Sequence, residues 1–179
     1  MTRFIAFLRA INVGGHTVTM ETLRGHFKQL GLGDVETFIA SGNVIFTSSA
    51  RNSGALEGKI EARLHASLGF EVKTFIRTDA EVGAIAQYEP FAASQVKSAR
   101  SFSVGFLTAP LDAAAKKTLL SLRNDVDDLH THGREVYWLS RNRQSESSFS
   151  NALFEKTLKM SATFRGVNTV QRLAAKYGR

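Results

Sequence analysis

The sequence predicts an α+β fold in which the order strand, helix, strand, strand, helix, strand occurs twice along the chain. Short apolar or alternating runs, typical of strands, are interspersed with segments whose apolar residues recur at helical spacing. Glycine, serine and asparagine separate these segments where turns are needed. The chain has 179 residues and a hydrophobic share of 43%. It is therefore long enough for two small subdomains that each bury a core.

The first copy of this order is predicted within residues 1–77. Its first helix is well marked, because Thr19 can cap it and Leu23 and Phe27 fall on one face. A later helix has Gly69 in the position that favours a left-handed end. The predicted elements are a strand over 3–9, a helix from 19 to 31, strands over 35–40 and 43–47, a helix from 53 to 69 and a strand over 70–76.

Residues 78–100 are predicted to form a linking helix and a linker. Thr78 and Glu81 have the spacing of a capping box, and Pro90 ends the helical pattern. The second copy is predicted over residues 101–179, but a final basic helix capped by Asn168 takes the place of an obvious fourth strand. Its other elements are a strand over 101–108, a helix capped by Asp112, strands over 126–131 and 135–140 and a helix over 150–160.

The predicted architecture is therefore a structural duplication of two ferredoxin-like subdomains. The first has the order βαββαβ, and the second has the order βαββα and ends in a helix.

Composition excludes several classes of protein. The chain has no cysteine, so disulfides, thiolate metal sites and cysteine nucleophiles are excluded. No apolar run approaches the length of a membrane span, and Arg9 interrupts the first apolar run too early for a signal peptide. We therefore expect a cytoplasmic protein with no membrane partner.

The positive charge is concentrated near the end of the chain. The formal net charge is +7, from 23 Lys and Arg and 16 Asp and Glu. After Gly133 there are nine basic residues and only three acidic ones. This asymmetry favours an anionic partner, such as nucleic acid, phosphate or an acidic protein surface. The alternative is a solvated basic face that only aids solubility.

Two loops are predicted to meet at one end of the first sheet. In a βαββαβ unit the first two strands are parallel, so the loop after the first strand and the hairpin after the second leave the sheet together. Both loops contain glycine, and the first leads into a helix whose amino end favours an anion. The predicted ligand-binding residues are Asn12, Gly14, Gly15, Ser41, Gly42 and Asn43. The alternative is that these glycines only form turns.

The basic region supplies a second set of candidates. Guanidinium, ammonium and amide groups are the donors that hold phosphate oxygens. The predicted anion-binding residues are Arg141, Arg143, Lys156, Arg165, Asn168 and Arg172. Tyr137 and Trp138 alternate in a strand, so one of them points inward, and Tyr137 can stack on a base if it is exposed.

No pattern indicates catalysis. The chain lacks a phosphate-binding P-loop and a nucleophile elbow, and we predict no catalytic residue and no cofactor. The three acidic residues at Asp125, Asp127 and Asp128 lack the spacing of a calcium loop, and the histidines lack the spacing of a metal motif. No metal site is therefore predicted.

Several stretches resemble the motifs of a known family. Residues 9–15, which have the sequence RAINVGG, and residues 39–46, IASGNVIF, resemble the amino-terminal signature of an uncharacterised, mainly bacterial family, the domain of unknown function 1697. Residues 149–156 and 168–170 resemble its later blocks. The resemblance implies a two-subdomain α+β fold, gives no activity to transfer, and points to the same two loops.

The chain departs from the family pattern near its end. The family usually shows Thr-Arg-Asn-Trp-Asn-Thr-Val where residues 164–170 are FRGVNTV, and Ser148 replaces a common lysine. The resemblance thus implies that a site in this region is weakened or altered here.

The leading functional hypothesis is non-catalytic binding of an anionic partner, above all nucleic acid, through the basic region and the glycine-bearing loops. The competing hypothesis is an enzyme or ligand-binding domain for a small phosphorylated or carboxylated molecule. A protein-interaction adaptor is a third reading. The sequence leaves the oligomeric state open.

Overall fold

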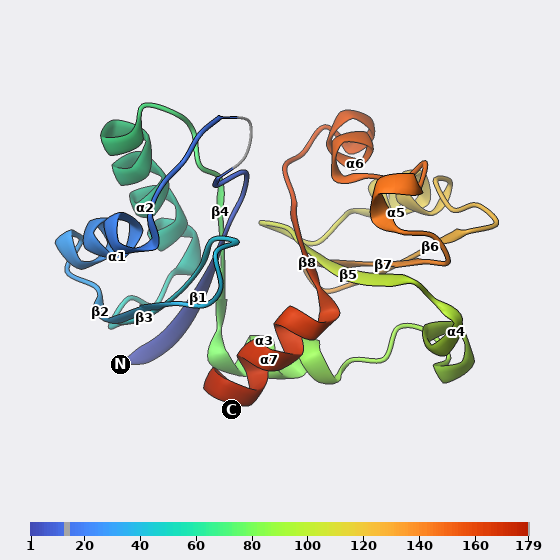
Figure 1. Ribbon diagram of the computed structural model, residues 1–179, viewed down its shortest axis with the longest axis horizontal. Helices are drawn as coiled ribbons and strands as arrows, with labels where there is room; N and C mark the ends of the chain where they lie inside the picture. Colours follow the sequence, from blue (N-terminus) through green and yellow to red (C-terminus); the bar gives the residue numbers. More distant parts are fainter. Residues whose placement is uncertain (13–14, 179) are drawn as a thin grey trace. The chain divides into compact units, whose positions relative to one another are not determined.

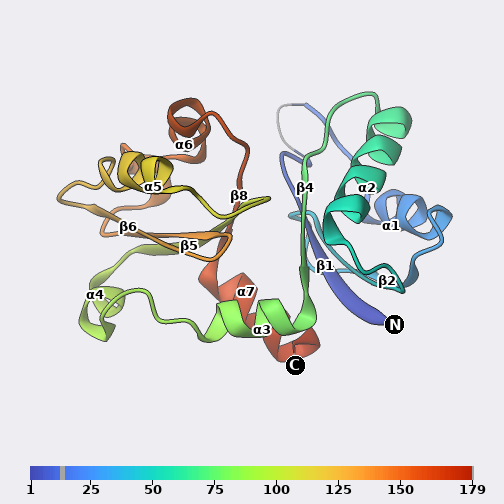
Figure 2. The same ribbon diagram turned by 180° about the vertical axis from the view of Figure 1, so that it is seen from behind.

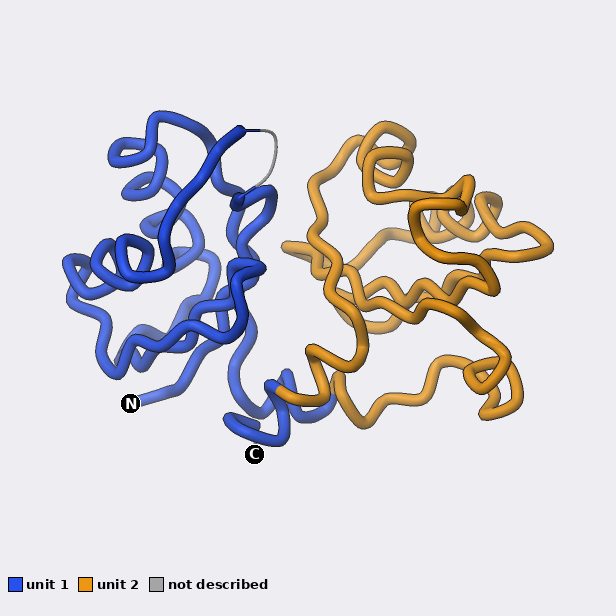
Figure 3. Tube along the Cα trace, viewed as in Figure 1, with its two compact units in different colours: residues 1–84, 173–179 blue, residues 85–172 orange. Residues whose placement is uncertain are grey.

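The computed structural model describes residues 1–12 and 15–178 and confirms the predicted α+β class. The chain divides into two compact units, each built on its own four-stranded sheet (Figures 1 and 3). Unit 1 comprises residues 1–84 and 173–179, and unit 2 comprises residues 85–172. The division therefore falls within two helices, α3 (Asp79–Gln87) and α7 (Val167–Tyr177).

Unit 1 has the sheet order β2-β3-β1-β4, in which all neighbouring strands are antiparallel. This is the predicted ferredoxin-like order, with β3 between the parallel strands β1 and β2. Two helices cover one face of the sheet, as both views show (Figures 1 and 2). The elements are β1 (Thr2–Leu8), α1 (Met20–Gln29), β2 (Gly33–Thr37), β3 (Asn43–Ser48), α2 (Ser53–Leu68) and β4 (Thr74–Thr78).

The predicted helix ends of unit 1 are confirmed. The hydroxyl of Thr19 accepts a hydrogen bond from the Thr22 amide at 3.1 Å, so it caps α1. Gly69 ends α2 with φ of 81°, a left-handed conformation that favours glycine. The capping box of α3 is complete, since Thr78 and Glu81 each accept from the other's amide at 3.1 and 2.7 Å.

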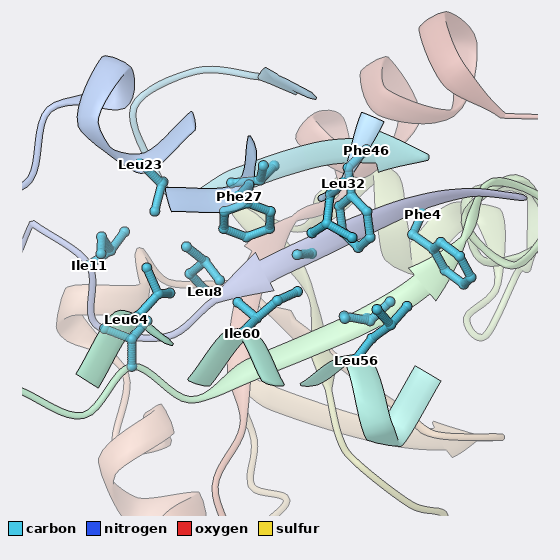
Figure 4. Packing of buried hydrophobic residues seen from close by; sticks show 14 of the residues in the cluster. Phe4, Leu8, Ile11, Leu23, Phe27, Leu32, Phe46, Leu56, Ile60 and Leu64 are labelled. Atoms are coloured by element: carbon cyan, nitrogen blue, oxygen red, sulfur yellow. The ribbon is translucent and has the colours of Figure 1, made fainter. Parts of the chain in front are cut away.

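The core of unit 1 lies between its sheet and the two helices (Figure 4). Phe27 of α1 and Phe46 of β3 are fully buried, and their ring centroids are 5.6 Å apart. Ile60 and Leu64 of α2 pack into the same cluster. Leu23 and Phe27, whose helical spacing predicts a buried face of α1, are both fully buried, so the periodicity of the sequence accounts for this part of the core.

The last part of α7 also belongs to unit 1. The Tyr177 hydroxyl donates a hydrogen bond of 2.5 Å to the Glu36 carboxylate of β2. The Arg3 guanidinium lies 6.0 Å from the centre of the Tyr177 ring, and Phe38 meets the ring edge-on. Burial, followed by the Glu36 hydrogen bond, raises the pKa of Tyr177 above its ordinary value.

Unit 2 repeats the topology of unit 1, with the antiparallel sheet order β6-β7-β5-β8. Helices α5 and α6 lie together on one side of this sheet, and the segment that carries α4 lies on the other (Figures 1 and 2). The elements are α4 (Ala93–Ser98), β5 (Ser101–Phe106), α5 (Ala113–Leu120), β6 (Asp127–His132), β7 (Glu135–Ser140), a 3-10 turn (Gln144–Glu146), α6 (Asn151–Leu158) and β8 (Thr163–Gly166).

The structure corrects three predicted elements. The fourth strand of the second copy, β8, is present and pairs with β5, so the order of unit 2 is βαββαβ and not βαββα. Helix α7 begins at Val167, so Asn168 lies inside its first turn and is not its cap. Strand β4 begins at Thr74 and not at Phe70. Phe70 follows directly after Gly69, the last residue of the α2 cap, and packs against the core of unit 1.

Within residues 1–12 and 15–178, no helix has the length and apolar character that crossing a bilayer requires.

Candidate functional site

The two loops predicted to converge in unit 1 do meet. The Leu8 amide at the end of β1 donates a hydrogen bond of 2.9 Å to the carbonyl of Gly42 in the hairpin between β2 and β3. Gly42 is so close to the first loop that an added Cβ atom would stand 2.4 Å from the Ile11 side chain. Backbone contact between the loops therefore requires glycine at this position.

The polar side chains of this loop pair make hydrogen bonds within the loops. The side-chain oxygen of Asn12 accepts from the Val18 amide at 2.6 Å. The side-chain amide of Asn43, which is fully buried, donates to the Phe38 carbonyl at 3.0 Å and to the Ser41 hydroxyl at 2.9 Å. Gly15 and Ser41 are exposed, and Gly14 lies outside the described residues. Ligand binding at this pair stays a prediction.

The backbone of the same loops adopts conformations that are unusual for residues other than glycine. Ala10, Asn12 and Ile39 have φ of 57°, 59° and 50°. Each such residue costs about 1–2 kcal/mol for a side chain that lacks a local compensating hydrogen bond. The Asn12 hydrogen bond to Val18 supplies one, whereas Ile39 is β-branched and 43% exposed. The loop contacts thus hold a strained backbone.

The predicted basic residues are spread over several elements of unit 2. Arg141 and Arg143 are exposed after β7, and Lys156 is exposed on α6. Asn168 and Arg172 are exposed on α7.

Arg165 of β8 differs from the other basic residues, because it is only 8% exposed. Its guanidinium donates to the Thr163 hydroxyl at 2.8 Å and to the Phe164 carbonyl at 3.0 Å. Burial lowers the pKa of Arg165 to about 10, so this residue remains charged at neutral pH. Anion binding by the whole set stays a prediction.

One cavity of unit 2 has a strongly donor-rich lining, and we call it the polar pocket. It measures about 570 Å³ and lies at the start of α7. Among the described residues that line it, one is Arg100 and none is Asp, Glu or His. Its other residues are Val96, Ala99, Ser101, Phe102, Ser103, Gln144, Gly166, Val167, Asn168 and Gln171.

Hydrogen bonds position the walls of the polar pocket. The Arg100 amide donates to the Ser140 carbonyl at 2.8 Å, which places Arg100 directly before β5 and beside the end of β7. The Ser101 hydroxyl donates to the Asn142 carbonyl at 3.1 Å, and the side-chain amide of Gln144 donates to the Ser103 hydroxyl. The start of β5 and the segment after β7 therefore form one rigid side of this cavity.

A second cavity, the aromatic pocket, lies on the sheet face opposite α5 and α6. It measures about 550 Å³. The linking segment supplies one wall and strands β5 and β7 supply another, and α7 closes it. Its apolar lining residues are Ile85, Ala86, Tyr88, Pro90, Phe91, Ala93, Val96, Phe102, Val104, Tyr137, Val167 and Val170, and its polar ones are Gln87, Glu89, Lys97 and Gln171.

Tyr137 and Trp138 are both buried, so exposed stacking by Tyr137 is not available. Trp138 packs against Phe149 in the core beneath the helices. Tyr137 faces the other side of the sheet and is 1% exposed, because Tyr88 of the linking segment lies over it with ring centroids 5.3 Å apart. Sequence reasoning missed the aromatic pocket, since no local pattern shows that this segment returns over the sheet.

A third cavity, of about 530 Å³, is lined by Arg141 but carries more carboxylates than guanidinium groups. Arg123 and Arg141 line it together with Asp125, Asp127 and Asp128. An anion there would meet carboxylates as well as guanidinium groups. No group of three or more His, Asp and Glu that could hold a metal ion occurs in the described part of the chain.

Asp127 is the buried member of the acidic cluster, and it organises a polar network. Its carboxylate accepts from the Trp138 indole at 2.9 Å and from the Asn124 side-chain amide at 3.0 Å. Burial alone raises the pKa of Asp127, but hydrogen bonds from Trp138, Asn124, Ser140 and Ser147 outweigh it. The pKa is therefore below its ordinary value.

Two histidines give the fold a pH dependence. His130 lies against Tyr88, with 2.8 Å between its Nε2 atom and the phenol oxygen. Its pKa is lowered by burial and by His132, although Asp128 acts in the opposite direction. The pKa of His26 in unit 1 is likewise lowered by burial and by Arg63.

The protein should therefore lose stability as the pH falls below about 6.5, the ordinary histidine value. In this range the unfolded chain binds more protons than the folded one, so stability rises with pH and is complete above the unfolded pKa. Thermal unfolding followed by circular dichroism between pH 5 and pH 8 measures this slope. His130→Gln should flatten the slope, whereas an unchanged slope would show that His130 does not contribute.

The fold and its cavities define an α+β protein of two ferredoxin-like units, with ligand-sized pockets in the second. The chain belongs to a family of proteins of unknown function, DUF1697, whose model matches residues 1–137. It is also similar to a solved structure, the conserved bacterial protein SP0830 from Streptococcus pneumoniae. The TM-score is 0.75, with 25% identity over 99% of this chain and 98% of that chain. No functionally curated protein matches the chain.

Proposed function

We propose that the protein is a non-catalytic binding protein for a phosphate-bearing partner, and that the polar pocket of unit 2 holds the phosphate. The observation that carries this proposal is the lining of that pocket, where the described residues include Arg100 with amide and hydroxyl side chains but no carboxylate. Arginine forms strong, charge-assisted hydrogen bonds with phosphate oxygens.

The position of the pocket at the start of α7 supports the same proposal. The first amide groups of a helix lack partners within the helix, and the positive end of the helix dipole adds to the charge of Arg100. Asn168 and Gln171 in the first turns of α7 also line the pocket and bring further donors. The excess of positive charge beyond Gly133 would attract such a partner from a distance.

The partner's phosphate can come from two sources, a single strand of nucleic acid or a small phosphorylated molecule. Fluorescence anisotropy of a labelled single-stranded oligonucleotide, at low and at physiological salt, tests the first source. Competition by ribose 5-phosphate tests the second. Binding of a strand should weaken steeply with salt, because phosphate contacts release counterions.

Arg100→Ala should weaken binding about tenfold, since it removes the charged donor of the pocket. Lys116→Ala is the matched control, because Lys116 is an exposed cation on α5 of the same unit that does not line the polar pocket. Equal losses in the two variants would indicate diffuse attraction to the basic surface and would contradict the proposed pocket. Absence of binding by both ligands would contradict the proposed function itself.

A further inference from the structure

The aromatic pocket adjoins the polar pocket. Val96, Phe102, Val167 and Gln171 line both cavities. The two cavities are therefore neighbours in unit 2, and a single ligand can reach from one into the other. Each cavity lies within the range of volumes that small-molecule sites occupy.

The walls of the aromatic pocket suit a flat ring. Phe91 and Phe102 face each other edge to face, with ring centroids 5.6 Å apart and planes inclined by 69°. Tyr88 is fixed by stacking on His132 at 4.0 Å and by its hydrogen bond with His130. These contacts hold the rings in place before any ligand arrives, so a bound ring would cost little reorganisation.

The polar residues of the aromatic pocket can recognise the edge of a heterocycle. Gln87 and Gln171 each offer a donor and an acceptor, Glu89 accepts and Lys97 donates. Flat heterocycles with mixed donors and acceptors on their edges, such as nucleobases, are bound in proteins by this combination of stacking and hydrogen bonds. A sugar phosphate alone would leave the aromatic walls without a partner.

We infer that the site accepts a nucleotide, with its base in the aromatic pocket and its phosphate in the polar pocket. The inference rests on the proposed function, since it takes the phosphate position from there. It adds the chemical class of the group that lies beside the phosphate. Phe102, which lines both cavities, is the residue at which the base and the phosphate-bearing part of the ligand meet.

Isothermal titration calorimetry of the full chain with adenosine and uridine 5′-monophosphates and with ribose 5-phosphate tests the inference. At least one nucleotide should bind about tenfold more tightly than ribose 5-phosphate, because stacking of the base adds to the phosphate contacts. The labelled single strand used above serves as a fourth ligand. Binding of the strand shows whether the polar pocket holds a phosphate even when the small ligands do not bind.

Phe102→Leu should reduce the affinity for the nucleotide to that for ribose 5-phosphate, since it removes the ring and keeps an apolar side chain. Phe38→Leu is the control, because Phe38 is a half-buried phenylalanine of unit 1. It should leave nucleotide binding unchanged. Thermal unfolding of both variants checks that they are folded.

Four outcomes would overturn the inference. Equal affinities for nucleotide and ribose 5-phosphate, or an unchanged nucleotide affinity in Phe102→Leu, would remove the base from the aromatic pocket and leave the proposed function intact. If the strand binds but neither the nucleotides nor ribose 5-phosphate bind, the inference is likewise contradicted and the proposed function remains. If none of the ligands binds, the proposed function falls and the inference falls with it.

Discussion

Replacing Gly42 by alanine is expected to lower the free energy of unfolding of unit 1 by about 3 kcal/mol. Gly42 has φ of 81°, which costs a residue with a side chain about 1–2 kcal/mol. In addition, the new Cβ atom would stand 2.4 Å from the Ile11 side chain and 3.2 Å from the Leu8 Cβ atom. Overpacking of this kind typically lowers the free energy of unfolding by a further ~1–3 kcal/mol. Urea denaturation measures the loss.

Gly15→Ala is the matched control for this prediction. Gly15 has φ of 83°, close to that of Gly42, but no atom of residues 1–12 or 15–178, apart from Gly15 and its chain neighbours, lies within 4 Å of the position of its Cβ atom. Only the conformational cost of about 1 kcal/mol should therefore appear. Equal losses in the two variants would show that the contact between the loops does not contribute to stability.

Asp127→Ala is expected to destabilise unit 2 by about 3 kcal/mol. The substitution leaves the buried Trp138 indole without its acceptor, which costs about 1–3 kcal/mol. The hydrogen bonds from Asn124, Ser140 and Ser147 to the carboxylate are lost as well. Asp125→Ala, at an exposed position nearby, should change stability by no more than about 0.5 kcal/mol. Chemical denaturation measures the free energy of unfolding of both variants. A similar decrease in the two would contradict a structural role for the buried carboxylate.

The same residue predicts the behaviour of the protein in acid. Because the pKa of folded Asp127 is lowered, its contribution to stability is complete above the ordinary value of 3.8 and is lost as the pH falls through the lowered folded value. This range lies below the range in which His26 and His130 act, so the two effects can be separated in one series of unfolding experiments.

The features that the sequence predicts well are those that depend on neighbouring residues. Thr19, Gly69 and the pair Thr78 and Glu81 mark helix ends through contacts within a few residues, and the structure has each of them where it is expected. The convergence of the two loops of unit 1 also follows from the strand order, which the alternation of helix and strand patterns predicts.

The features that the sequence does not predict depend on pairing between distant segments. Strand β8 has only four residues and is held by β5, where Val104 is opposite Arg165, so no local alternation reveals it. Tyr137 is buried because Tyr88 lies over it, and the aromatic pocket exists for the same reason. A single sequence carries no signal for such contacts between the linking segment and the sheet.

The dependence of unit 1 on Tyr177 has a consequence for biosynthesis. The ribosome finishes residues 1–84 early, yet the contacts of Glu36 and Phe38 with Tyr177 form only when residue 177 has been translated. Unit 2 comprises the contiguous residues 85–172, so its translation is complete before that of unit 1. The nascent chain therefore exposes an incomplete sheet surface until translation has passed Tyr177, and a transcript truncated in the codons for α7 would damage the half of the protein that was made first.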